Sequence, residues 1–418
     1  MATLTAGRWR PKAAVLPALR YLQRPAQLVR GYERANLRAD LIAGLTVGVV
    51  LLPQAIAFSL LAQLPPQMGL YTAVVGGIAA ALWGSSEQLH SGPTNTISLL
   101  VFSTLAVSII PGSDQYILAA GMLALMAGVL QLGLGLLRLG FIVNFVSHSV
   151  IVGFGTAAGV LILVRQIDPL LGLSLPKANV LSGLVNSALA VPQTHLLTAA
   201  IGLGSMAIIL LLRRLNPRWP GALIALLVAT AVVALLGDRA EGVAVIGAIG
   251  GGLPRPVSLP VLNLQLISDL STGALAVAAI GLVQTTAVSR SLASQTHQRL
   301  DNNQEFVGQG IANVLSGLFG GYATSGSFTI SAVKFRAGAR TRLASIVAAL
   351  VVLLVMLVAG PIGEYMPVSA IAAALIVTAY NMLDKAEIRR ILRGAPGDAI
   401  IMVVTFLGTP FLNLDFAV

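Results

Sequence analysis

Long apolar blocks recur along almost the whole chain, and they restrict the fold more than any other feature of the sequence. Residues 117–137 and 343–358 are two such blocks and contain no charged residue. Their lengths are close to the roughly 20 residues with which a helix crosses a hydrocarbon layer about 30 Å thick. Only 10% of the 418 residues are charged, whereas soluble domains have about 25%. The sequence therefore predicts an all-α polytopic membrane protein and excludes a soluble enzyme.

A hydropathy window of about 19 residues divides the chain into thirteen predicted membrane spans. They cover residues 41–62, 69–84, 93–109, 116–137, 141–164, 195–212, 220–236, 267–289, 305–319, 327–336, 343–359, 366–381 and 398–413. The chain has no cysteine, which excludes disulfide bonds and thiolate metal sites. We expect no catalytic residues, no metal ion and no cofactor.

The basic residues outside these spans predict the orientation of the protein. With the N-terminus in the cytoplasm, 22 Lys and Arg fall on the cytoplasmic side and four on the other side, which follows the positive-inside rule. The formal net charge of +11 then reflects membrane topology, and we expect no nucleic-acid partner. Basic residues between 334 and 393 are expected to anchor the protein to anionic headgroups of the bilayer. No cleavable signal precedes residue 41, so we expect a multi-pass protein of the cell inner (plasma) membrane.

Two predicted spans, the third and the tenth, are interrupted in similar ways. The third follows a polar run at residues 85–91 and opens at Gly92-Pro93; the tenth follows residues 320–324 and opens at Ser325-Gly326-Ser327. Each polar run comes after a helix of small residues that ends in an aromatic residue and glycine. Seven spans separate the two copies, an odd number, so they are inverted across the membrane. Either run alone could be a surface loop, but the pair is typical of a transporter whose substrate site lies between broken helices.

Half-helix starts at membrane depth are suited to holding an anion. The first N–H groups of a helix have no intrahelical acceptor, and the macrodipole adds roughly half a positive charge there. Neither start contains Lys or Arg, so backbone and hydroxyl groups are expected to bind the anion. Gly92 and Gly326 allow close approach to the backbone, and Pro93 fits the first turn of a helix. Each hydroxyl could instead be an ordinary helix cap or packing contact.

Two glutamines lie near the middle of otherwise apolar spans. Gln54 follows Pro53 in the first span, and Gln284 lies near the centre of the eighth. An uncharged polar residue at this depth faces protein or water, so we expect both side chains to line the cavity, with a helix–helix contact as the alternative for Gln54. The predicted substrate-binding residues are Gln54, Ser91, Gly92, Pro93, Thr94, Asn95, Gln284, Ser325, Gly326, Ser327, Phe328 and Thr329.

Acidic residues, which ion coupling usually needs, are nearly absent from the predicted spans. Glu87, before the third span, is the candidate for proton coupling, with interfacial placement near Arg138 or a loop cation as the alternative. Glu305 and His90 are expected at the membrane interface. No carboxylate is expected at the midplane, where a Na⁺ site would use carboxylate oxygens.

Two stretches resemble the sulfate permease (SulP) family, the bacterial relatives of the animal solute carrier 26 anion transporters. They are Pro65-Pro66-Gln67-Met68-Gly69-Leu70-Tyr71-Thr72-Ala73, continuing to Gly84-Ser85-Ser86, and Asp301-Asn302-Asn303-Gln304-Glu305, continuing through Gly308-Gln309-Gly310 to Gly320-Gly321-Tyr322 and Ser325-Gly326-Ser327-Phe328. The resemblance implies a 7+7 inverted-repeat, uracil-transporter-like fold, in which a core domain moves like an elevator against a gate domain. It also implies an anion held between spans 3 and 10, and usually a homodimer.

The resemblance further implies how the chain divides into domains. The expected parts are a cytoplasmic basic N-terminal segment at 1–40, the core of the first repeat at 41–137, its gate part at 138–266, the core of the second repeat at 267–359 and an incomplete gate part at 360–418. A fourteenth span and the cytoplasmic STAS domain of full-length members are expected to be missing, so that the sequence is truncated after about 13 spans.

Several positions depart from the pattern that the resemblance implies. Met68 stands where members often have tyrosine, Glu87 where they often have a basic residue, and Ile330 where some animal members have arginine. Gln284 takes the place of a Glu or Asp that belongs to the cation site in Na⁺-coupled bicarbonate carriers. The resemblance therefore implies transport that does not depend on Na⁺.

The expected function is secondary active transport of a small anion, with sulfate or a similar oxyanion first and bicarbonate or a dicarboxylate next. Transport is expected to be coupled to protons or to proceed by exchange. A nucleobase–proton symporter of the same fold is an alternative, although it would be expected to carry carboxylates in spans 8 and 10. An anion channel or a non-transporting membrane scaffold is a further alternative. We expect no enzymatic activity.

Overall fold

The computed structural model describes residues 21, 23–142, 148–173, 175, 180–216, 219–249 and 252–411. Several features predicted from the sequence lie outside these residues. They are the first 20 residues of the N-terminal segment 1–40, the start of the span at 141–164, the cations Lys177 and Arg218, and residues 412–418 at the end of the last span.

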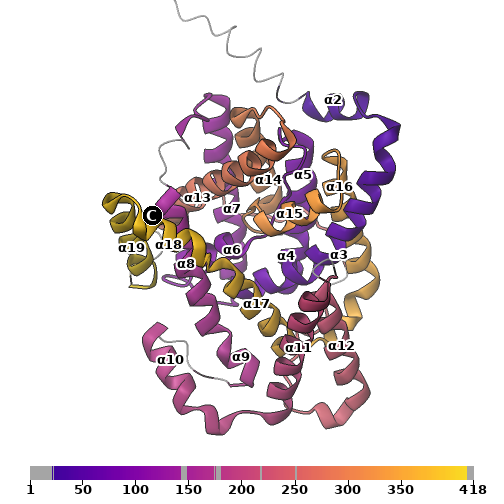
Figure 1. Ribbon diagram of the computed structural model, residues 1–418, viewed down its shortest axis with the longest axis vertical. Helices are drawn as coiled ribbons and strands as arrows, with labels where there is room; N and C mark the ends of the chain where they lie inside the picture. The colour runs from indigo at the N-terminus through magenta and orange to yellow at the C-terminus, as the bar shows by residue number, and fades with distance from the viewer. Residues whose placement is uncertain are drawn as a thin grey trace, which may run out of the picture.

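The described part of the chain folds almost entirely into helices (Figure 1). The longer helices are α3 (Leu37–Leu61), α7 (Asp114–Leu136), α8 (His148–Arg165), α11 (Leu196–Leu215), α12 (Gly221–Leu236), α13 (Leu264–Thr296), α14 (Asn302–Leu318), α16 (Leu343–Ala359), α17 (Val368–Met382) and α19 (Pro396–Phe411). The shorter helices are α2 (Arg24–Arg30), α4 (Pro66–Tyr71), α5 (Gly77–Trp83), α6 (Asn95–Leu105), α9 (Ile167–Leu171), α10 (Val180–Leu189), α15 (Phe328–Arg336) and α18 (Lys385–Arg393). A π-helical segment, η2 (Thr72–Gly76), joins α4 to α5, and two strands of two residues each, β1 (Ser91–Gly92) and β2 (Ser325–Gly326), precede α6 and α15.

Helices occupy the described part of each of the thirteen predicted spans, which confirms the all-α membrane fold. In the part of the chain that the structure describes, seven helices are long and apolar enough to cross a membrane, and α6, α16 and α19 are shorter apolar helices. The sequence analysis missed α2, α9, α10 and α18. These helices are short, and α18 has the sequence KAEIRRILR, in which Ile391 alone is buried, so a hydropathy window does not detect it.

The helices pack in two groups, and the contacts within each group repeat between the two halves of the chain. In the first group, α3 packs on α16 as α13 packs on α7, and α6 packs on α13 as α15 packs on α3. In the second group, α8 packs on α19 as α17 packs on α11. Each of these contacts has its equivalent if every helix is replaced by the helix seven spans away, so that α3, α6, α7, α8 and α11 correspond to α13, α15, α16, α17 and α19. The packing therefore contains the 7+7 inverted repeat that the sequence predicted.

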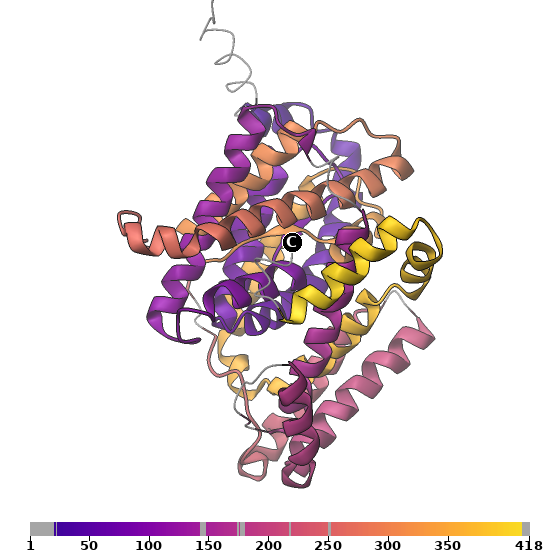
Figure 2. The ribbon, with the colours of Figure 1, turned by 90° about the vertical axis from the view of Figure 1, so that its left-hand side faces the viewer.

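The two groups are visible as separate regions of the molecule. In Figure 1, α13, α14 and α16 lie in the upper part, and α11 and α12 lie in the lower part. Figure 2 shows the same separation from the side, with the long helix α13 crossing the upper half. Contacts of α3 with α12 and α17, and of α6 with α8, join the two groups. We call the first group the core domain and the second the gate domain.

Glycines allow the backbones of α7 and α14 to pack directly against each other. Gly121, Gly128 and Gly135 recur every seven residues on α7, and Gly310 and Gly317 do so on α14. A Cβ at Gly310 would come within 2.5 Å of the amide nitrogen of Leu132, and a Cβ at Gly317 would come within 2.4 Å of the carbonyl oxygen of Gly121. This small-residue contact, common between membrane helices, holds α7 and α14 together.

We predict that Gly310→Val destabilises the protein, because its side chain would have to displace the α7 backbone. Overpacking of this kind costs about 1–3 kcal/mol or more. A lower midpoint of thermal unfolding in detergent would report the loss. Gly133→Val on α7 is the matched control, since a Cβ there meets no atom within 4 Å. Equal shifts for both variants would contradict the backbone contact.

Candidate functional site

The two broken helices meet at a short antiparallel pairing inside the core domain. Ser91 pairs with Gly326 and Gly92 pairs with Ser325, which joins β1 to β2. The helices α6 and α15 begin only a few residues later, at Asn95 and Phe328. The prediction that the two half-helix starts face each other is confirmed, and neither polar run is an independent surface loop.

Equivalent hydroxyl groups cap the two half-helices. Thr94 caps α6 by accepting a hydrogen bond from the N–H of Ile97 at 3.4 Å, and Ser327 caps α15 by accepting one from Ile330 at 3.3 Å. The Thr94 and Ser325 hydroxyl oxygens lie 2.9 Å apart and so link the two starts directly. Pro93 does not lie in the first turn of α6, as the sequence analysis expected, because Thr94 is the cap and the helix begins after it.

A few backbone donors at these starts remain without a partner inside their own helix. In α15 the N–H of Ser327 donates to the carbonyl of His90 at 2.9 Å, and the N–H of Ile330 is used by the cap. Helix geometry leaves the N–H groups of Phe328 and Thr329, between them, with no acceptor within α15. These groups lie at the positive end of the helix macrodipole, so the α15 start can bind an anion.

A cavity of about 810 Å³ lies between the core and gate domains, next to the half-helix starts. Five of the twelve predicted site residues line it: Asn95, Gln284, Ser327, Phe328 and Thr329. The gate domain contributes the opposite wall with residues of α8, α17, α18 and α19, including Phe154, Thr378, Met382 and Glu387. Asn381 and Asp384, which also line the cavity, are exposed to solvent. The cavity therefore reaches from the half-helix starts to the surface around α18.

The other seven predicted residues lie outside this lining. Ser91, Gly92, Pro93, Thr94, Ser325 and Gly326 are buried and belong to the paired segment itself. Gln54 is half-buried on α3, whereas Phe58, about one turn later, lines the cavity. The structure thus brings the two starts together and places Gln284 at the cavity, but it does not place Gln54 there.

Side chains of α13 and α14 hold the paired segment in position. Gln284 accepts a hydrogen bond from the Ser325 hydroxyl at 3.1 Å, and Thr285 accepts one from the N–H of Gly326 at 2.9 Å. Gln309, buried on α14, accepts from the Ser91 hydroxyl at 3.0 Å and donates to the carbonyl of Thr324 at 2.8 Å. Gln309 therefore contacts both extended segments.

The sequence analysis missed Gln309, although a signal for it was present. Glu305, Gln309 and Asn313 are spaced four residues apart, so they lie on one face of α14. All three are buried. A polar face on a helix that lies in a membrane points to protein rather than lipid, and it marks the surface against which the extended segments pack.

The role expected for Gly326 needs a correction. A Cβ there would not fill the approach to the anion, because it would point at α13 and at the start of the polar run. It would lie 2.9 Å from both the Cα of Thr285 and a methyl carbon of Leu89. At Gly92, the glycine of the other paired strand, a Cβ would meet only the ring of His90, at 3.7 Å or more. The two glycines are therefore not equivalent, and Gly326 is required for packing.

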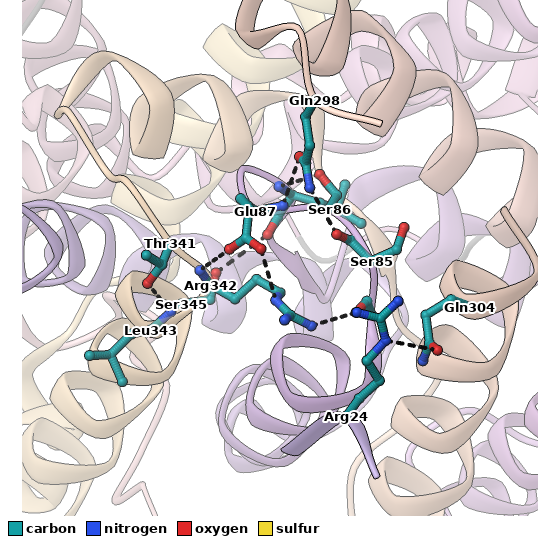
Figure 3. A network of polar contacts seen from close by, with 12 residues as sticks. Arg24, Ser85, Ser86, Glu87, Gln298, Gln304, Thr341, Arg342, Leu343 and Ser345 are labelled. Carbon is teal, nitrogen blue, oxygen red and sulfur yellow. Dashed lines mark hydrogen bonds and ion pairs between the residues drawn. The ribbon is translucent and has the colours of Figure 1, made fainter. Parts of the chain in front are cut away.

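Glu87 lies in a network of polar contacts (Figure 3), and it is not among the residues that line the cavity. Its carboxylate lies 3.5 Å from the Nε of Arg342 and accepts a hydrogen bond from the Arg342 N–H at 3.0 Å. Its own N–H donates to Gln298, which in turn donates to the carbonyl of Ser85. The partner is thus a loop cation, as the alternative interpretation held, and it is Arg342 rather than Arg138.

Several charged residues expected at the membrane surface are buried instead. Lys334 is 0% exposed and Arg342 is 6% exposed, so neither anchors the protein to headgroups. Glu305 and His90 are also buried, at 4% and 0% exposure. The physical reason is that the loops at 84–90 and 337–342 fold onto the core domain, where their backbone groups hydrogen-bond Lys334, Arg342 and Glu305, whereas the ring nitrogens of His90 have no hydrogen-bond partner among the described residues. The carboxylate of Glu305, for example, accepts hydrogen bonds from the N–H groups of Ser85 and Ser86.

The inverted repeat, the paired half-helix starts and the cavity between two domains together define a membrane transporter. The family model of the sulfate permease family matches residues 37–405 of this chain. The chain belongs to this family, which confirms the resemblance seen in the sequence, and it is an anion transporter rather than an enzyme.

Named relatives agree with this assignment. The chain is 34% identical over 398 residues to the putative sulfate transporter YvdB of Bacillus subtilis, covering 93% of this chain and 73% of that protein. It is 31% identical over 389 residues to the probable sulfate transporter Rv1739c of Mycobacterium tuberculosis, covering 93% and 69%.

Solved structures with the same fold support the assignment further. The murine solute carrier 26 family member A9 anion transporter in the inward-facing state matches with a TM-score of 0.87 and 26% identity, over 100% of this chain and 71% of that chain. The transmembrane domain of the cyanobacterial bicarbonate transporter BicA matches with a TM-score of 0.79 and 28% identity, over 93% and 98%.

We predict that Gly326→Ala lowers the rate of anion uptake about tenfold or more, because the added methyl group displaces α13 backbone and so moves the start of α15. A displacement that costs the transported complex about 1.4 kcal/mol of free energy suffices for a tenfold loss of uptake. Uptake into proteoliposomes is the measurement. Gly92→Ala is the matched control from the other repeat and should retain uptake within about twofold, since its Cβ makes only an ordinary contact. A larger loss in Gly92→Ala than in Gly326→Ala would be evidence against this account.

Proposed function

We propose that this protein is a secondary carrier of a small anion, with sulfate or a similar oxyanion as its first substrate. The observation that carries the proposal is the pair of half-helix starts, joined at β1 and β2, of which the α15 start borders a cavity between two domains. Uncharged N–H and hydroxyl donors suit an anion that must be released again. The names of the two relatives, both sulfate transporters, support sulfate over other anions.

The predicted site residues have three kinds of role in this proposal. Asn95, Gln284, Ser327, Phe328 and Thr329 contact the anion from the cavity wall. Ser91, Gly92, Pro93, Thr94, Ser325 and Gly326 shape the paired segment from which both starts emerge. Gln54 contributes through α3, on which α15 packs.

The movement that we propose is an elevator motion of the core domain, residues 41–137 and 267–359, against the gate domain, residues 138–266 and 360–418. A cavity whose two walls come from different domains supports this motion, because sliding one wall past the other changes which side of the membrane it opens to. The exposed residues at its α18 end, and the likeness to a transporter solved facing inward, support an inward-facing conformation. We further propose a homodimer in the cell inner membrane with its N-terminus in the cytoplasm.

Bicarbonate and dicarboxylates are the next substrates in this proposal, and bicarbonate is favoured by the likeness to BicA. A nucleobase–proton symporter of the same fold is less favoured, because α15 contains no carboxylate. A channel would show flux that does not saturate. These alternatives differ in substrate and kinetics, so one panel of transport measurements separates them.

We predict saturable uptake and counterflow of radiolabelled sulfate in proteoliposomes, and no uptake of uracil. The panel comprises sulfate, bicarbonate, fumarate, chloride and uracil. Ser327→Ala should raise the KM for the transported anion about fivefold, because loss of a helix cap costs about 1 kcal/mol and also removes a hydroxyl from the cavity wall. Uracil uptake, or a sulfate flux that rises linearly with concentration, would contradict the proposal.

We also propose that transport does not depend on Na⁺ and proceeds by exchange or by proton coupling through Glu87. The neutral Gln284 at the cavity supplies no carboxylate for a cation, which supports independence from Na⁺. Glu87 is the first residue to test, because among the predicted residues it alone is acidic.

The expected result is equal uptake with Na⁺ or K⁺ on both sides of the liposome membrane. If an inward proton gradient stimulates the parent protein, Glu87→Gln should abolish that stimulation. Glu241→Gln, at an exposed position outside the membrane helices, should retain it. Strong stimulation by Na⁺ alone would defeat the first claim, and proton stimulation that survives in Glu87→Gln would remove Glu87 from the coupling role.

A further inference from the structure

Lys334, in the last turn of α15, is a buried cation in the core domain. It is 0% exposed, although charged residues in the interior of membrane proteins are rare and usually functional. Its Nζ donates to the carbonyls of Glu87 and Leu89, at 2.8 and 3.2 Å, and to the hydroxyl of Ser345 at 2.8 Å. Three acceptors for three N–H groups match an ammonium ion. The three acceptors are neutral oxygen atoms, and their number suits the protonated, positively charged form of Lys334.

The acidic residues of the same region are satisfied by other groups. Glu87 pairs with Arg342. Asp40 accepts hydrogen bonds from the N–H groups of Arg340 and Thr341 and from the Thr341 hydroxyl. Glu305 accepts from the backbone of the segment after α5. None of these carboxylates is a hydrogen-bond partner of the Lys334 ammonium within the described residues, so no acid neutralises that charge by direct contact.

Lys334 lies close to the start of α15, where the anion is proposed to bind. Six residues of helix separate Phe328 from Lys334, a rise of about 9 Å. The Lys334 side chain also binds the carbonyl of Leu89, and the carbonyl of the next residue, His90, accepts the N–H of Ser327 at the cap of α15. Both connections place Lys334 near the half-helix start, and a separation of about 10 Å, close to the helix rise, is used for the Coulomb energy below.

We propose that Lys334 provides the fixed positive charge of the anion site and favours anions of higher charge. The inference rests on the anion-binding site of the proposed function and deepens it. Lys334 acts through its field, without touching the anion, so it is a specificity-determining residue rather than a ligand. Over about 10 Å the attraction of one charge for a singly charged anion corresponds to between about 2-fold and 16-fold in affinity, for effective dielectric constants from 80 down to 20.

The charge dependence distinguishes a field from a structural role. Coulomb energy is proportional to the charge of the anion, so the factor for a doubly charged anion is the square of the factor for a singly charged one. Lys334 also joins α15 to the segment before β1 through its hydrogen bonds to the carbonyls of Glu87 and Leu89. If this structural contact were its whole role, removing the side chain would weaken binding of both classes of anion by the same factor.

The experiment compares sulfate with perchlorate, two tetrahedral oxyanions that differ in charge. Dissociation constants are measured for the purified parent, Lys334→Gln and Lys334→Arg in detergent. Lys334→Gln should weaken perchlorate binding about 5-fold, in the middle of the range above, and sulfate binding by the square of that factor, about 25-fold. Lys334→Arg keeps the charge and should stay within about twofold of the parent for both anions.

A second variant tests the same field in the opposite direction and does not depend on the folding of Lys334→Gln. Glu87 lies beside Lys334, because its backbone carbonyl accepts a hydrogen bond from the Lys334 ammonium. Glu87→Gln removes the negative charge of its side chain, so it should tighten anion binding, and more for sulfate than for perchlorate. Equal factors for both anions in Lys334→Gln, or weaker binding of sulfate in Glu87→Gln, would overturn the inference alone. A parent protein that binds neither anion would overturn the proposed function, and with it this inference.

Discussion

The paired half-helix starts depend on one constraint, that backbone N–H and C=O groups inside a membrane protein need partners. An extended segment at membrane depth exposes many such groups. Here β1 and β2 satisfy each other, and Thr285 and Gln309 take up groups that the pairing leaves. The first turn of α15 then keeps backbone donors that can face a ligand. The same packing that makes the broken helices stable thus decides where an anion can bind.

This constraint explains which parts of the site were readable in the sequence. The spans follow from hydropathy, because lipid requires long apolar helices. The broken third and tenth spans stood out because a polar run between apolar blocks is unusual, and their odd separation indicated inversion. Thr94 and Ser327 were recognisable as candidates because hydroxyl residues at helix starts act as caps.

Other parts of the site depend on contacts between segments that are far apart in the chain, so the sequence alone gave the wrong answer or none. Lys334 was read as a membrane anchor because it ends an apolar helix near a basic loop, whereas the segment at 84–90 covers it. Gly326 was expected to face the ligand, but the direction of its missing Cβ depends on where α13 lies. Gln54 was placed at the cavity from its depth, but Phe58, four residues later on the same face of α3, lines the cavity instead.

The two half-helices are alike in their caps but differ at their other ends, and the difference bears on the field at the site. α15 has nine residues, so the negative end of its macrodipole lies within about 13 Å of its start and opposes the positive end. Lys334 and Arg336 lie in that last turn, whereas α6 has no basic residue in its last turn. Counting from the caps Thr94 and Ser327, the position of Lys334 corresponds to Val101 in α6. A short helix can therefore attract an anion about as well as a longer one when a cation offsets its C-terminal end. In α15 that cation belongs to the helix itself, whereas at the end of α6 it comes from α8, where Arg165 lies over the ring of Phe102.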